Sequence, residues 1–166
     1  RAVLTPFLRH GLDRGEKVVS IVDAHTAETV LGYLRDDGVD AASFQARGQL
    51  VILSHDEMYL RTGTFDPADM IARLRAATEQ AVADGYSALR VTGETSWALR
   101  GMPGSERLIE YEAQVNEFIS GILYEAMIRE RKQHFQLEEL LEEGEDFARV
   151  SFTRISGNAI PGAPAA

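Results

Sequence analysis

The stretch at residues 88–99, ALRVTGETSWAL, decides the fold of this chain. It begins as a short apolar strand and runs directly into a turn that carries Glu94, Ser96 and Trp97. In α/β proteins, ligands are held at the carboxyl edge of such strands. We therefore expect this segment to define both the central sheet and a candidate ligand site.

The composition is that of a folded, acidic protein. The chain has 166 residues, of which 45% are hydrophobic and 26% charged, which suits one globular domain. A net charge of -9 argues against a nucleic-acid-binding surface, because neutralising phosphates requires clustered Lys and Arg. The absence of cysteine excludes disulfides and thiolate metal ligands. Without a recognisable signal peptide or membrane-spanning run, we expect a cytoplasmic protein with no direct contact to nucleic acid or membrane.

Segments before this stretch alternate between helix and strand patterns. A parallel sheet is favoured because helices and strands follow each other with short connections, as in right-handed βαβ units. The clearest helix start is at Asp66, an N-cap followed by Pro67 at the first helical position. The predicted elements are helices at 1–14, 26–37 and 67–84 and strands at 17–23, 49–54 and 88–94.

The second half of the chain continues with a long helical pattern. Counted from Leu108, Glu112 falls inside the apolar stripe of this helix. Residues 136–143 predict a short acidic helix. Residues 147–155 alternate between apolar and polar side chains, which predicts a strand with one wet face at a sheet edge.

Several motifs together resemble one family of sensory domains. They are Gly15-Glu16-Lys17-Val18-Val19, Gly93-Glu94-x-Ser96-Trp97 and Glu110-Tyr111-Glu112-Ala113. The first resembles the helix-to-strand passage of KaiC/RecA-like domains. The whole set resembles the MEDS family, the methanogen/methylotroph DcmR sensory domain, over residues 1–118. The resemblance implies a RecA/KaiC-like three-layer α/β/α fold with a mostly parallel sheet and a module that binds small ligands, with methylated or halogenated hydrocarbons suggested for some members.

The sequence departs from the family pattern at both ends. Family members begin with a strand bearing His-x-Cys, whereas this sequence starts inside a helical pattern, so we expect an N-terminal strand to be missing. Their strand after the long helix reads like CQYDR, whereas residues 122–133 read ILYEAMIRERKQ. We predict one α/β sensory domain over 1–155 and a flexible tail over 156–166. Its expected partners are a small-molecule ligand and an output or regulatory protein domain, and a homodimer is left open.

The sequence carries no recognisable P-loop. A nucleotide hydrolase on this scaffold needs a Gly-rich loop ending in Gly-Lys-Ser/Thr, which does not occur in the sequence. Glu94 stands where a RecA-like enzyme places an acidic group near Mg²⁺ or the attacking water, and we interpret it as a remnant. We predict no catalytic residues, no metal site and no cofactor. The alternatives are a degenerate ATPase-like interaction domain, with acidic residues 138–146 as its surface, and an ATPase whose phosphate loop precedes Arg1.

The candidate ligand site lies at the sheet edge. Trp97 is interpreted either as core packing or as the wall of an apolar pocket. Arg90 interrupts a buried strand and needs a partner, for which Glu94 and Glu112 are the candidates. That ion pair either fixes a helix on the sheet or opens onto a ligand. The predicted ligand-binding residues are Asp23, His25, Glu57, Tyr59, Arg90, Glu94, Ser96, Trp97, Tyr111 and Glu112.

Overall fold

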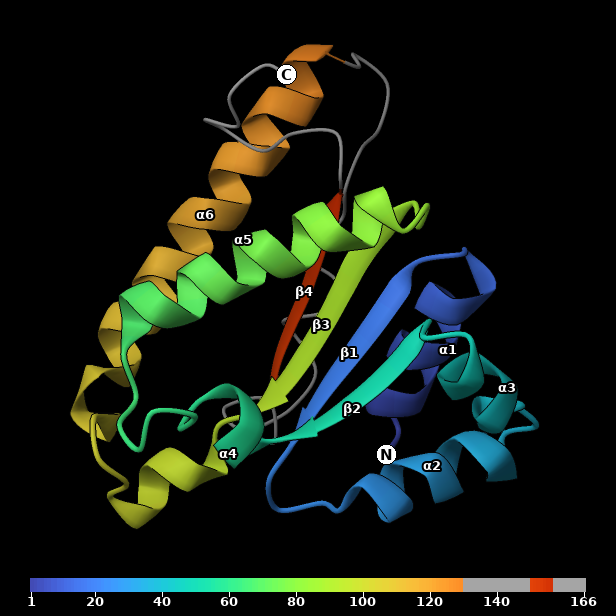
Figure 1. The fold of residues 1–166 in the computed structure, drawn as a ribbon, viewed down its shortest axis with the longest axis horizontal. Helices are drawn as coiled ribbons and strands as arrows, with labels where there is room; N and C mark the ends of the chain where they lie inside the picture. The colour runs from blue at the N-terminus through green and yellow to red at the C-terminus, as the bar shows by residue number, and fades with distance from the viewer. Residues whose placement is uncertain (130–149, 157–166) are drawn as a thin grey trace.

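A computed structural model describes residues 1–129 and 150–156 of the chain. Its sheet has the strand order β2-β1-β3-β4 (Figure 1). The strands are Lys17–Val22 (β1), Leu50–Ser54 (β2), Ala88–Glu94 (β3) and Val150–Ser156 (β4). The first three run parallel, and β4 pairs antiparallel with β3. The predicted α/β class with a mostly parallel sheet is therefore confirmed, and the edge strand expected at 147–155 is found at 150–156.

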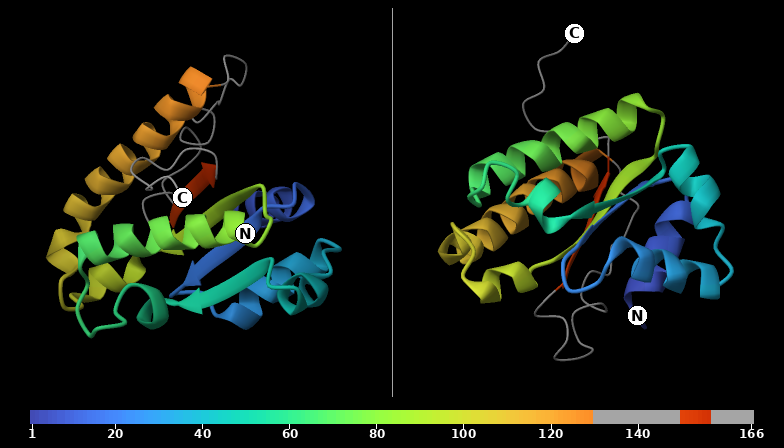
Figure 2. Two further views of the ribbon diagram at one scale, coloured as in Figure 1. Left: turned by 45° about the horizontal axis from the view of Figure 1, so that its top comes forward. Right: turned by 60° about the horizontal axis from the view of Figure 1, so that its bottom comes forward.

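Helices cover both faces of the sheet and make three layers (Figure 2). One face packs against α1 (Leu4–Asp13), α2 (Ala27–Asp36) and α3 (Ala41–Ala46), and this side of the core includes Leu8 and Leu34. The other face packs against α5 (Pro67–Ala83) and α6 (Leu108–Arg129). The strands supply alternating side chains to these two halves of the core, as expected for a sheet buried on both faces.

The helix starts follow the predicted caps. The side chain of Asp66 accepts hydrogen bonds from the backbone amides of Ala68 (2.9 Å) and Asp69 (3.1 Å), with Pro67 at the first helical position. The Thr26 hydroxyl accepts from the amide of Thr29 at 3.1 Å and opens α2. Both caps satisfy amides that a helix leaves unpaired at its start.

Four short elements lie outside the predicted set. They are α3, α4 (His55–Met58), η1 (Ser96–Arg100) and η2 (Ser105–Arg107). Each is six residues or shorter, too short to show an apolar period. The two short α-helices have local cap signals: Asp40 caps α3, and Ser54 forms a capping box with Glu57 before α4. The predicted acidic helix at 136–143 lies outside the described residues, as does the predicted tail except for Ser156, which is the last residue of β4.

Arg90 corrects one prediction about the core. Its Nε donates to Oε2 of Glu16 at 2.6 Å, so the ion pair is formed with neither Glu94 nor Glu112. The two side chains are 7% and 0% exposed. The guanidinium also lies over the ring of Phe7, 4.5 Å from its centroid. Arg90 therefore fixes α1 on the sheet.

Candidate functional site

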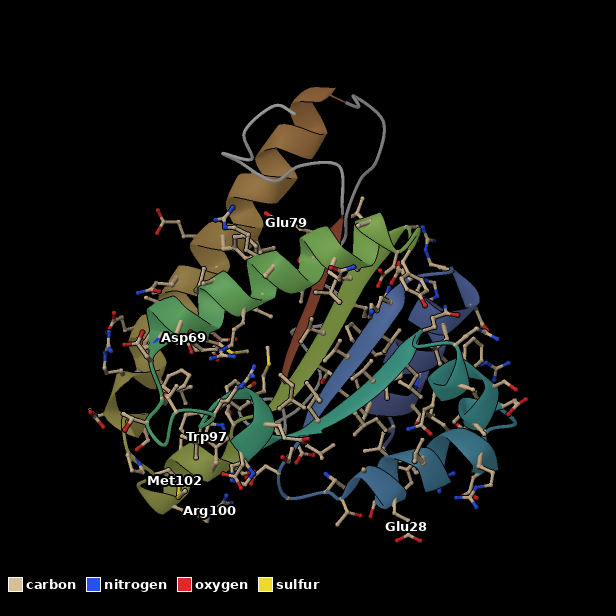
Figure 3. The ribbon with its side chains drawn as sticks, viewed as in Figure 1. Glu28, Asp69, Glu79, Trp97, Arg100 and Met102 are labelled. Atoms are coloured by element: carbon tan, nitrogen blue, oxygen red, sulfur yellow. The ribbon has the colours of Figure 1, made fainter. Side chains whose placement is uncertain are left out.

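The carboxyl ends of the three parallel strands bring polar side chains to one edge of the sheet. Asp23 follows β1, His55 follows β2 and Glu94 ends β3. The segment after β3 carries Trp97, Arg100 and Met102, which lie together beside α4 (Figure 3). This edge is where an α/β sheet most often holds a ligand.

Asp23 is the centre of a hydrogen-bonded group that we call the Asp23 network: Asp23, His55, Ser96 and Arg100. Arg100 binds its carboxylate with both Nη atoms, at 2.8 and 2.7 Å. The Ser96 hydroxyl donates to Oδ2 at 2.5 Å, and Nδ1 of His55 lies 3.0 Å from Oδ1. The Asp23 side chain is only 2% exposed. The network ties η1 to the ends of β1 and β2.

The network also sets the charge state of Asp23. Burial on its own would raise the pKa of this carboxyl. The hydrogen bonds from Arg100 and Ser96, with the charges of His55 and Arg100, outweigh burial and lower the pKa below its ordinary value. Asp23 is therefore ionised at neutral pH, and both of its oxygens are occupied by protein donors.

Glu94 holds the loop between β1 and α2. Its Oε2 accepts the backbone amides of Asp23 (2.7 Å) and His25 (3.1 Å). Its Oε1 contacts Nδ1 of His25. Both carboxylate oxygens of Glu94 therefore contact groups of the β1–α2 loop. The role that these contacts indicate is to hold this loop in place.

Beside this polar edge lies an aromatic cluster of Tyr59, Phe65, Trp97 and Tyr111. Trp97 is fully buried, with ring centroids 5.2 Å from Tyr59 and 4.9 Å from Phe65. Phe65 and Tyr111 meet edge to face at 5.5 Å. These distances fall in the range of favourable aromatic pairs. The indole is therefore part of the core, as one of the two interpretations of Trp97 expected.

The indole nitrogen of Trp97 has an unsatisfied hydrogen bond. Within the described part of the chain, Nε1 has no hydrogen-bond partner although it is buried. An unpaired buried donor costs about 1–3 kcal/mol, and most buried indole N–H groups find an acceptor. Among the described residues of the cluster, Nε1 of Trp97 is the only buried side-chain polar atom without a hydrogen-bond partner.

The two tyrosines of the cluster stay protonated. Burial raises the pKa of Tyr59 well above its usual range, and electrostatic interaction with Tyr111, Glu112 and Glu94 adds to this effect. Burial, together with the carboxylate of Glu112, also raises the pKa of Tyr111. Glu112 is half-buried and acts on both rings. Neither tyrosine is set up as a base at neutral pH.

Two loops close around the cluster. The amide of Phe65 donates to the carbonyl of Pro103 at 2.8 Å. Gly104 has φ of 85°, and a Cβ there would lie 2.2 Å from the Phe65 carbonyl oxygen, so glycine is required for this contact. The cluster is thus enclosed by the loop before α5 and the loop after η1.

The structure brings together most, but not all, of the predicted ligand-binding residues. Glu57 is exposed, and its Oε2 accepts the amide of Ser54 at 2.7 Å as part of the cap of α4. Arg90 pairs with Glu16 on the α1 side of the sheet. The remaining predicted residues form the polar edge or the aromatic cluster, or lie beside the latter: Asp23, His25, Tyr59, Glu94, Ser96, Trp97, Tyr111 and Glu112.

Sequence reasoning missed three residues of the site. Arg100 ends η1 just before a segment of Gly and Pro, so its pairing with Asp23 had no local signal. His55 directly follows β2, but nothing in its local sequence indicates that it would contact Asp23. Phe65 directly precedes the Asp66 cap, the position where a hydrophobic staple would have suggested burial. Among the described residues, no three His, Asp or Glu side chains are grouped closely enough to hold a metal ion.

Fold and site together define a three-layer α/β domain with a polar network at the carboxyl edge of its parallel strands. The model of a sensory domain family, MEDS: MEthanogen/methylotroph, DcmR Sensory domain, matches residues 1–127, and the chain belongs to this family. It is accordingly a sensory signalling domain. Comparison with curated proteins and with solved structures gave no match. No helix in the described ranges has the length and hydropathy needed to cross a bilayer.

Proposed function

We propose that this domain senses a small molecule that binds in the aromatic cluster beside the Asp23 network, without catalysing a reaction. The observation that carries this proposal is the buried indole N–H of Trp97, which lacks an acceptor in the described part of the chain. A ligand that supplies an acceptor would recover the free energy that this donor forfeits when buried.

The surroundings of this donor define the chemistry of the ligand. Tyr59, Phe65 and Tyr111 offer ring faces and edges, which suit a compact apolar body. Trp97 offers one neutral donor, which suits a single acceptor atom. Small methylated or halogenated compounds with one polar atom fit both requirements. They also agree with the words methanogen and methylotroph in the name of the family.

The Asp23 network supplies a route by which occupancy changes the surface. Trp97 lies in η1 between Ser96 and Arg100, which both bind Asp23. A ligand that shifts the indole therefore acts on two of the contacts that hold η1 to β1. The exposed Arg100 carries that shift to the surface, where an output or partner regulatory domain can respond to it.

The test is a binding panel on the intact chain. Trp97 is the only tryptophan, so its fluorescence reports on the cluster alone. Small chlorinated and methylated one-carbon compounds, toluene and Mg·ATP are titrated while fluorescence and the unfolding midpoint are followed. A ligand of the proposed class should stabilise the fold by about 2.7 kcal/mol at a hundredfold excess over its Kd. That gain should be lost in Trp97→Phe and kept in Tyr86→Phe, a control outside the cluster.

The same panel separates the second candidate function, an ATPase-derived domain that acts through protein contacts. This candidate is favoured by Glu94, whose carboxylate is committed to the amides of Asp23 and His25. If none of the compounds stabilises the chain, the contact-only function replaces the sensor. If Mg·ATP alone does so, the sensor is replaced by an enzyme whose phosphate loop lies upstream of Arg1.

A further inference from the structure

We propose that the outer edge of β2 pairs with β2 of a second copy of this chain, so that two sheets join across a two-fold axis. Of the described strands, β2 is an edge strand whose only neighbour is β1. Its apolar residues Val51, Ile52 and Leu53 are consecutive and remain half-exposed. This inference is independent of the proposed ligand, because it uses none of the aromatic cluster.

The main chain of β2 offers hydrogen-bonding groups on its outer side. The carbonyl of Gln49 accepts the amide of Val18 at 2.7 Å and so points toward β1. Backbone groups alternate in direction along a strand, so the amide and carbonyl of Ile52 point away from β1. In the described part of the chain these two groups have no hydrogen-bond partner. A second strand would pair both.

The strand also lacks two features that protect the edges of sheets from pairing. Natural edge strands are protected by charged residues, proline, bulges or a covering segment. The sequence of β2, Leu-Val-Ile-Leu-Ser, contains no charge and no proline. An apolar edge without charge or proline pairs readily with another strand.

The two ends of β2 carry opposite charges. This arrangement favours an antiparallel β2 strand of a second copy as the partner. Arg47 precedes the strand and is exposed, and Asp56 and Glu57 follow it and are exposed. A two-fold axis through Ile52 makes the paired strands antiparallel, with Val51 facing Leu53 of the second copy. The basic end of each strand then lies next to the acidic end of the other. The edge is therefore complementary to itself.

Sedimentation velocity of the full chain tests the charge pairing. Wild type should form a dimer whose Kd rises about tenfold or more in Arg47→Glu and in Asp56→Arg, because each change places like charges together twice in the dimer. The double variant exchanges the two charges and should restore the Kd toward the wild-type value. Arg35→Glu, the same charge change in α2, should leave it unchanged. A monomeric wild type, or single variants with an unchanged Kd, would overturn the proposal.

Cross-linking tests the position of the axis. The chain has no cysteine, so Ile52→Cys introduces the sole thiol. Residues directly opposite in a hydrogen-bonded antiparallel pair have Cα atoms about 5.5 Å apart, within disulfide reach. Oxidation should give a covalent dimer with Ile52→Cys and none with Ala42→Cys, an exposed control in α3. A dimer that cross-links equally at both positions, or only at residue 42, would place the interface elsewhere. The charge variants leave the strand intact and remain decisive if Ile52→Cys does not fold.

Discussion

Nε of Arg90 and Oε2 of Glu16 lie 2.6 Å apart although 74 residues separate them in the chain. Both side chains are buried, so this contact joins the turn after α1 to the middle of β3. A buried ion pair adds little net stability compared with a packed apolar pair, but loss of one partner leaves a charge buried without compensation. The pair therefore adds a buried polar contact to the apolar packing that docks α1 on the sheet.

Glu16→Gln should lower the free energy of unfolding by about 3–5 kcal/mol, because Arg90 then keeps its charge in the core without a carboxylate. Urea unfolding followed by circular dichroism measures this loss. The matched control is Asp13→Asn, which breaks the exposed ion pair with Arg9 (3.6 Å) and should cost less than about 1 kcal/mol. Equal, small effects of the two changes would show that Arg90 does not depend on Glu16.

Gly93→Ala should strain the aromatic cluster. A Cβ at Gly93 would lie 2.0 Å from the hydroxyl oxygen of Tyr59, so the ring has to move away from β3. We expect a loss of about 1–3 kcal/mol in unfolding free energy, as for other overpacked cores. Gly93→Ala made in a Tyr59→Phe background should lower the unfolding free energy by less, because the clashing hydroxyl oxygen is absent. A cost that is the same in both backgrounds would contradict this contact.

Asp23→Asn should destabilise the fold in a pH-dependent way. The pKa of Asp23 is lowered in the folded protein, so its ionised form stabilises the fold above the unfolded pKa. This contribution is lost as the pH falls through the folded pKa. The variant should lose about 1–3 kcal/mol at neutral pH, and its difference from wild type should shrink as the pH falls below about 4.

Urea unfolding as a function of pH measures the effect of Asp23→Asn. Asp36→Asn is the control, because it removes an exposed carboxylate 3.4 Å from Arg1 and should change stability little at any pH. If the difference in unfolding free energy between Asp23→Asn and wild type stayed constant down to acidic pH, the network would not stabilise the ionised carboxylate.

The main elements of the fold were predictable because their signals are local. The Asp66-Pro67 start of α5 and the apolar runs of β1 and β2 are each contained in a few neighbouring residues. The short helix α3 escaped prediction because six residues with one buried side chain show no helical period. The long helices and strands could therefore be predicted from local sequence patterns. The shortest elements were found only in the three-dimensional structure.

The polar edge of the site was predictable in part from residues at the ends of strands. Asp23 and Glu94 stand at strand ends, so topology alone brings them together. Arg90 was assigned the wrong partner because Glu94 is close in sequence, whereas Glu16 becomes a neighbour only when α1 packs on the sheet. Arg100 was missed for the same reason, since its partner Asp23 is 77 residues away. Ion pairs between residues far apart in the chain could therefore not be predicted from local sequence.

The most direct test of the sensory site is the ¹H–¹⁵N resonance of the indole N–H of Trp97. The chain has one tryptophan, so one indole cross-peak reports on this donor. We predict that the free protein gives the shift of an indole N–H without an acceptor. A compound from the panel that stabilises the fold should move this peak in the direction of hydrogen bonding, with saturation at the same concentration. An indole peak that stays in place while such a compound saturates the protein would contradict a ligand site at Trp97.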